Sequence, residues 1–74
     1  MKPEHMVHMA NQIARFFSAY PHDEAVAGVA DHIKKFWEPR MRTQLFDFVN
    51  AKGEGLEPLV LDAVKVLAAK AAAH

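Results

Sequence analysis

Apolar side chains recur at three- and four-residue steps along most of the chain, which is the period of an amphipathic helix rather than of a strand. The first such stripe predicts a helix that begins near Pro3, because proline suits the first turn. It should end before Pro21, since the residue preceding a proline avoids helical geometry. The stripe consists of Met6, Met9, Ala10, Ile13, Phe16, Phe17 and Tyr20.

A second stripe predicts a helix that follows directly, with Asp23 as its N-cap and Glu24 in its first turn. Its apolar positions are Val26, Val29, Ala30, Ile33 and either Phe36 or Trp37. The interior Gly28 costs about 1 kcal/mol of helix propensity relative to alanine. We interpret this glycine as a site of close approach to a neighbouring helix.

The remaining half of the chain predicts two more helices. The third runs from Pro39 to about Asn50, and it is either separate from the second or the far arm of one kinked helix. The fourth begins at Pro58, after the glycine-containing loop AKGEGLEP. Their apolar faces contain Met41, Leu45, Phe48 and Val49 in the third helix, and Leu59, Val60, Ala63, Val64 and Leu67 in the fourth, preceded by Leu56.

These patterns predict an all-α fold, a small bundle of three to four short antiparallel helices connected by short loops. Residues 1–74 should form a single domain, with residues 69–74 as a frayed tail. A domain of this length buries only about 60% of the surface that its unfolded chain exposes, so its stability alone is marginal.

Composition excludes several classes of protein. The chain has no cysteine, which rules out disulfides and thiolate metal sites and suits a cytoplasmic location. Its formal net charge of zero argues against nucleic-acid binding, which normally requires a basic excess. No apolar run approaches the roughly 20 residues of a membrane span, and the first residues lack the apolar segment of a secretory signal.

Catalytic chemistry has little support in the sequence. His5 and His8 stand one turn apart, with Glu4 nearby, but no third metal ligand follows at a local spacing. Ser18 is the only serine, and there is no glycine-rich phosphate loop. We therefore expect no catalytic, cofactor or metal site in this chain.

The stretch FWEPRMR, residues 36–42, is the most unusual part of the chain. Arg40 and Arg42 fall in the first turn of the third helix, where positive charge opposes the helix dipole by roughly 0.3–1 kcal/mol each. Two explanations stay open. The guanidinium groups pair internally, with Asp31 and Glu38 as acceptors, or they meet carboxylates, phosphates or backbone carbonyls of a partner.

This stretch also concentrates the residue types that are enriched at the centres of protein interfaces. We therefore predict a partner-binding segment that consists of Lys34, Lys35, Phe36, Trp37, Glu38, Arg40, Met41, Arg42 and Phe46. The alternative for Trp37 is that it fills the core, with only the arginines facing outward.

The chain resembles a known family in three segments: MANQIARFF (9–17), VADHIKKFWEPRMR (29–42) and LEPLVLDAVKVL (56–67). Over about residues 5–68 it is similar to the delta subunit of NAD-dependent, molybdenum-containing formate dehydrogenase. The FWEPRMR stretch, with MANQI at the expected distance before it, carries most of the resemblance.

The resemblance implies a non-catalytic accessory subunit of a cytoplasmic complex. In that complex the alpha subunit holds a bis-molybdopterin guanine dinucleotide (bis-MGD) molybdenum centre and iron–sulfur clusters. The beta and gamma subunits pass electrons through FMN and further clusters to NAD. The delta subunit carries no cofactor and would support assembly, stability or cofactor retention. The alternatives are a transient maturation chaperone for the same enzyme and a stand-alone helical regulatory or ligand-binding module.

Overall fold

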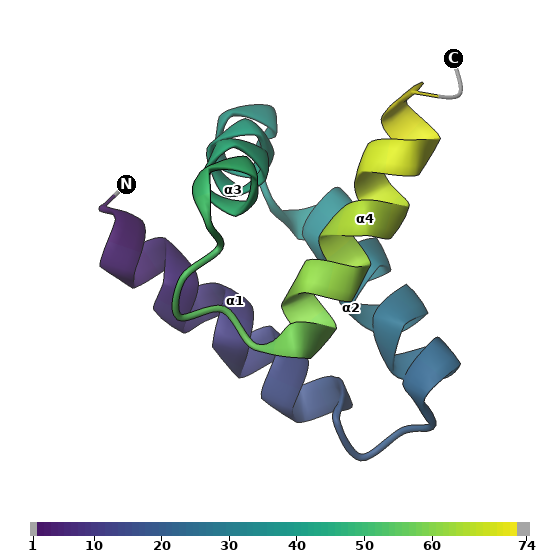
Figure 1. Cartoon of the computed structure of the whole chain (residues 1–74). Coiled ribbons are helices and arrows are strands. Elements are labelled where there is room, and N and C mark those ends of the chain that lie inside the picture. Colours follow the sequence, from purple (N-terminus) through teal and green to yellow (C-terminus); the bar gives the residue numbers. More distant parts are fainter. Residues whose placement is uncertain (1, 73–74) are drawn as a thin grey trace.

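The computed structural model describes residues 2–72, and these residues form four helices and no strand. The helices are α1 (Pro3–Phe17), α2 (His22–Phe36), α3 (Pro39–Ala51) and α4 (Pro58–Ala72) (Figure 1). The predicted all-α fold is confirmed, and the third and fourth helices begin at the predicted prolines. The α4 helix continues to Ala72, and residues 73–74 lie outside the described part, so the fraying of residues 69–74 stays a prediction.

All four helices contribute to one hydrophobic core. The α2 helix packs mainly against α4, while α1 contacts α2, α3 and α4. In Figure 1, α3 is seen almost along its axis, whereas α1 and α4 are seen from the side. The largest fully buried side chains are Met6 of α1, Val29 and Ile33 of α2, Leu45 of α3 and Val60 of α4.

Two predicted helix boundaries are wrong by a few residues. The α2 helix begins at His22 after Pro21, so Asp23 lies within the first turn, where its charge favours the dipole, and does not act as the N-cap. The α1 helix ends at Phe17, three residues before Tyr20. The Ser18 hydroxyl donates a hydrogen bond of 2.7 Å to the carbonyl of Arg15, which favours termination there.

The second and third helices are separate elements. Trp37 has an extended backbone, with φ −89° and ψ 137°, and Glu38 is also extended, with φ −66° and ψ 154°. This geometry is required before Pro39, whose ring disfavours the helical region for the preceding residue. A sharp corner therefore forms at residues 37–38.

The loop between α3 and α4 is tied to α1 by Asn11. The side-chain Nδ2 of Asn11 donates to the carbonyl of Gly55 at 2.9 Å. The backbone N–H of Glu57 donates to Asn11 Oδ1, also at 2.9 Å. Gly55 has a positive φ of 88°, which side-chain-bearing residues rarely adopt. One side chain thus fixes the entry into α4.

We expect Asn11→Ala to lower the free energy of unfolding by about 1–3 kcal/mol, because two hydrogen bonds worth roughly 0.5–1.5 kcal/mol each are lost. Urea unfolding followed by circular dichroism measures this. Gln12→Ala is the matched control, because this neighbouring amide is exposed. Equal stability of the two variants would show that Asn11 does not hold the loop.

Candidate partner-binding surfaces

The predicted partner-binding segment does not form one surface, because the corner turns its side chains in different directions. Phe36 is 72% exposed, whereas Trp37 is only 5% exposed and belongs to the core. The extended backbone at Trp37 separates these two neighbours. Trp37 thus takes the core position that the sequence left open as an alternative, and it offers a partner little surface.

An apolar groove lies between α1 and α2. Its volume is about 460 Å³, and it is lined by Gln12, Ile13, Phe16, Phe17, His32 and Phe36. The Phe36 ring packs against the His32 ring, with 4.7 Å between the ring centroids. An adjoining hollow shares four of these residues and extends to Met9, Trp37 and Met41. We call the surface lined by the first six residues the apolar groove.

Phe16 is a groove residue that sequence reasoning assigned to the core. It is 68% exposed, and its ring meets the Phe17 ring edge-on, with centroids 5.0 Å apart. Adjacent residues on a helix point about 100° apart, given 3.6 residues per turn. Two consecutive phenylalanines therefore cannot both point into the core, and this signal was present in the sequence.

The groove depends on the absence of a side chain at Gly28. The Phe17 ring lies against this glycine, and a Cβ atom added there would come within 2.5 Å of the ring. The interpretation of Gly28 as a site of close helix approach is confirmed. The glycine lets the Phe17 ring pack against α2, where it contacts the Phe16 ring.

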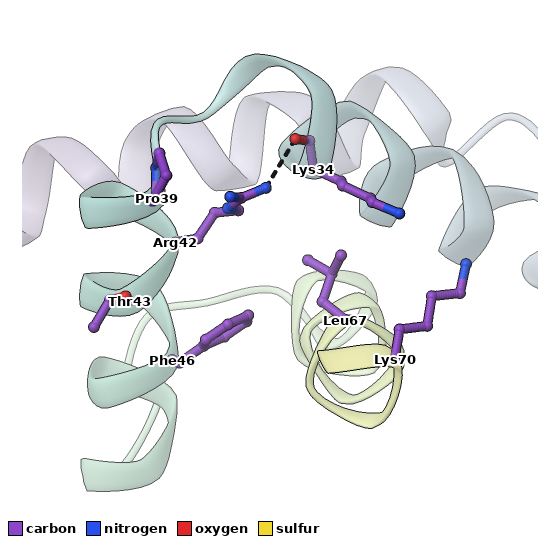
Figure 2. Close-up of a pocket in the computed structure, with 7 residues that line it drawn as sticks. All are labelled: Lys34, Pro39, Arg42, Thr43, Phe46, Leu67 and Lys70. Carbon is purple, nitrogen blue, oxygen red and sulfur yellow. Dashed lines mark hydrogen bonds between the residues drawn. The ribbon is translucent and has the colours of Figure 1, made fainter. Parts of the chain in front are cut away.

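A second hollow, which we call the basic pocket, lies on the side of the corner where α2, α3 and α4 meet. Its volume is about 360 Å³, and its lining residues are Lys34, Pro39, Arg42, Thr43, Phe46, Leu67 and Lys70 (Figure 2). The Nη1 of Arg42 donates a hydrogen bond of 2.9 Å to the backbone carbonyl of Lys34. Leu67 and Lys70 come from α4, and no pattern in the sequence predicted that they join this site.

The internal acceptors predicted for the arginines are not used. Asp31 forms an ion pair with Lys35 instead, at 3.1 Å. Within residues 2–72, neither Asp31 nor Glu38 pairs with Arg40 or Arg42. Arg42 instead donates to the backbone carbonyl of Lys34, which is an internal partner but not a carboxylate.

The predicted residues thus fall into separate sets. Phe36 lines the apolar groove, and the adjoining hollow includes Phe36, Trp37 and Met41. Lys34, Arg42 and Phe46 line the basic pocket. Lys35, Glu38 and Arg40 are exposed and line neither hollow. The role of all these residues in binding a partner stays a prediction.

Other chemistry is sparse in the part of the chain that the structure describes. No group of three or more His, Cys, Asp or Glu side chains there is arranged to hold a metal ion. His22 Nε2 lies 3.2 Å from Asp62 Oδ2 and links α2 to α4 at the surface. None of the helices between residues 2 and 72 has the length and apolar character needed to cross a membrane.

Comparison with known protein families gives a match over most of the chain. The family model described as NADH-dependent formate dehydrogenase delta subunit FdsD matches residues 5–64. This range covers most of α1, all of α2 and α3, and about the first half of α4. No curated protein and no solved structure matches the chain significantly.

We expect the two aromatic residues at the corner to differ sharply in their effect on stability. Trp37→Ala should lower the free energy of unfolding by about 3–5 kcal/mol, because it opens a cavity in the core. Phe36→Ala should change it by no more than about 0.5 kcal/mol, as is usual for surface positions. Urea unfolding measures both values, and similar losses for the two variants would contradict the burial of Trp37 and the exposure of Phe36.

The contact between Gly28 and Phe17 predicts that the effect of Gly28→Ala on stability changes sign when the Phe17 ring is removed. Overpacking should cost Gly28→Ala about 1–3 kcal/mol, against a gain of about 1 kcal/mol in helix propensity, so we expect a net destabilisation of up to about 2 kcal/mol. In a Phe17→Ala background the clash is absent, so the same substitution should stabilise. A double-mutant cycle by urea unfolding measures this coupling. Additive effects would show that the Phe17 ring does not restrict position 28.

Proposed function

The chain belongs to the family of NADH-dependent formate dehydrogenase delta subunits, because the family model covers most of it, and we propose that it binds the catalytic molybdenum subunit of that enzyme as a non-catalytic accessory subunit. Its contribution is to the assembly, stability or cofactor retention of a complex that oxidises formate and reduces NAD. The beta and gamma subunits of the same cytoplasmic complex complete the electron path in this proposal.

The apolar groove is the observation that supports this function most strongly. Phe16 and Phe36 form part of its lining from opposite helices, and each is about seventy per cent exposed, at 68% and 72%. Contiguous exposed apolar surface on a small protein marks an interaction site, and large aromatic side chains commonly dominate binding energy. A subunit that works by contact with a larger protein needs such a surface.

The cofactors of the complex belong to the other subunits in this proposal. The chain contains no cysteine, so it supplies no thiolate ligand for an iron–sulfur cluster. Among residues 2–72 there is also no cluster of metal-ligating side chains. Following the family resemblance, we propose that the alpha, beta and gamma subunits hold the molybdenum centre with its bis-MGD, the iron–sulfur clusters and FMN.

A structural role is consistent with how the chain distributes its polar groups. Within the described residues no buried side-chain nitrogen or oxygen lacks a hydrogen-bond partner, and no polar or charged residue is buried. The apolar groove presents phenylalanine rings, and the basic pocket presents lysine and arginine side chains, which suit association with a protein.

We expect the double variant Phe16→Ser, Phe36→Ser to lose association with the catalytic subunit. Loss of two aromatic contacts worth about 2 kcal/mol each corresponds to an affinity roughly 1,000-fold weaker. Co-purification of the catalytic subunit with the tagged chain measures association. Formate-dependent NAD reduction by the recovered complex measures the functional consequence.

Tyr20→Ser is the matched control, because Tyr20 is 49% exposed and does not line the groove. Circular dichroism confirms that each variant is folded. If the double variant co-purifies as well as the control, binding through the groove is disproved. If the unmodified chain is absent from the mature complex and associates only with the immature catalytic subunit, its role is that of a maturation factor.

A further inference from the structure

The basic pocket collects positive charge from three helices. Lys34 comes from α2, Arg42 from α3 and Lys70 from α4, and no acidic residue is among the lining residues. Within the described part of the chain, none of these three cations forms an ion pair. The whole chain has a formal net charge of zero, and this local excess arises because the fold brings Lys70 of α4 to Lys34 and Arg42, which are close in the sequence.

The Arg42 side chain is held in place before any partner arrives. Its Nη1 donates to the Lys34 carbonyl at 2.9 Å, and Figure 2 shows it spanning the gap between α3 and α2. One hydrogen bond leaves other N–H groups of the guanidinium fork available for a carboxylate. A group that is already oriented loses less conformational entropy when it binds a partner.

The pocket also has an apolar side. In Figure 2, Phe46 and Leu67 lie below Arg42 and Lys34, and Lys70 lies beside Leu67. A simple inorganic anion gains nothing from such contacts, but a peptide with an acidic residue beside an apolar one matches both halves. Pro39 occupies the first position of α3 and has no N–H, so this helix start lacks one of the backbone donors that usually bind phosphate.

We infer that the basic pocket binds an acidic segment of a partner subunit, with an Asp or Glu carboxylate of the partner against Arg42, Lys34 and Lys70, and an adjacent apolar side chain against Phe46. This inference rests on the proposed role as an accessory subunit. The partner then contacts two sides of one corner: the apolar groove between α1 and α2, and the basic pocket where α2, α3 and α4 meet.

The test reverses charge in the pocket without touching the Arg42 hydrogen bond. The double variant Lys34→Glu, Lys70→Glu keeps the backbone carbonyl that Arg42 uses. The matched control, Lys52→Glu, Lys65→Glu, makes the same change in net charge at exposed positions outside the pocket. Calorimetry measures the affinity of each folded full chain for an enzyme complex purified without the delta subunit, at increasing NaCl concentrations.

We expect the pocket variant to bind at least about tenfold more weakly than the control, since repulsion replaces attraction at a complementary interface. The affinity of the unmodified chain and of the control should fall as salt rises, and that of the pocket variant should not. Equal affinities and equal salt dependence for the two variants would overturn the inference while leaving the accessory role intact. Failure of the unmodified chain to bind at all would overturn the proposed function itself.

A second measurement separates a peptide site from an anion site. Inorganic phosphate is titrated into the isolated chain while the NMR signals of Arg42 and Lys70 are followed. Saturable shifts confined to the pocket would overturn the inference in favour of a phosphate site. Shifts that track ionic strength only, together with weakened binding of the enzyme by the pocket variant, support an acidic segment as the occupant.

Discussion

The restriction that Pro39 places on the residue before it determines the corner on which the rest of this structure depends. Glu38 must leave helical geometry, and Trp37 is already extended. The indole consequently enters the core while the preceding Phe36 stays outside. The same break starts a new helix, so α3 can leave in a different direction from α2. The residues on either side of this corner line the two surfaces: Phe36 lines the apolar groove, and Pro39 lines the basic pocket.

Arg42 shows how the corner is stabilised despite an unfavourable position. A cation in the first turn of α3 opposes that helix's dipole by roughly 0.3–1 kcal/mol. The Lys34 carbonyl, however, lies in the last turn of α2, where carbonyls have no partner within the helix. Arg42 supplies a charged donor to it, and such hydrogen bonds contribute about 1.5–3 kcal/mol. Its presence therefore has a reason within the fold, whereas Arg40 has no such contact among the described residues.

The sequence predicted the four helices well because their signals are local: apolar residues at helical spacing, and prolines at three of the starts. The interpretation of Gly28 was also correct because its signal is local. A glycine inside a helix indicates close packing without any need to know which residue packs against it. The sequence could not decide whether Phe36 or Trp37 enters the core, because that depends on the backbone angles of the corner. Lys70 could not be placed beside Lys34, because their proximity arises from the packing of α4 against α2 and α3. The exposure of Phe16 was not predicted, although its neighbour Phe17 already pointed inward.

The two hollows impose different requirements on a partner. The apolar groove contributes affinity with little directional preference, because burial of apolar surface is non-directional. The basic pocket contributes orientation, because charge complementarity fixes register and excludes wrong partners more than it raises affinity. The stability of a 74-residue domain is marginal by itself. A partner that binds only the folded chain adds its own binding free energy to that stability. Contacts on both sides of the corner would thus hold the orientation of α2 relative to α3, on which the basic pocket depends.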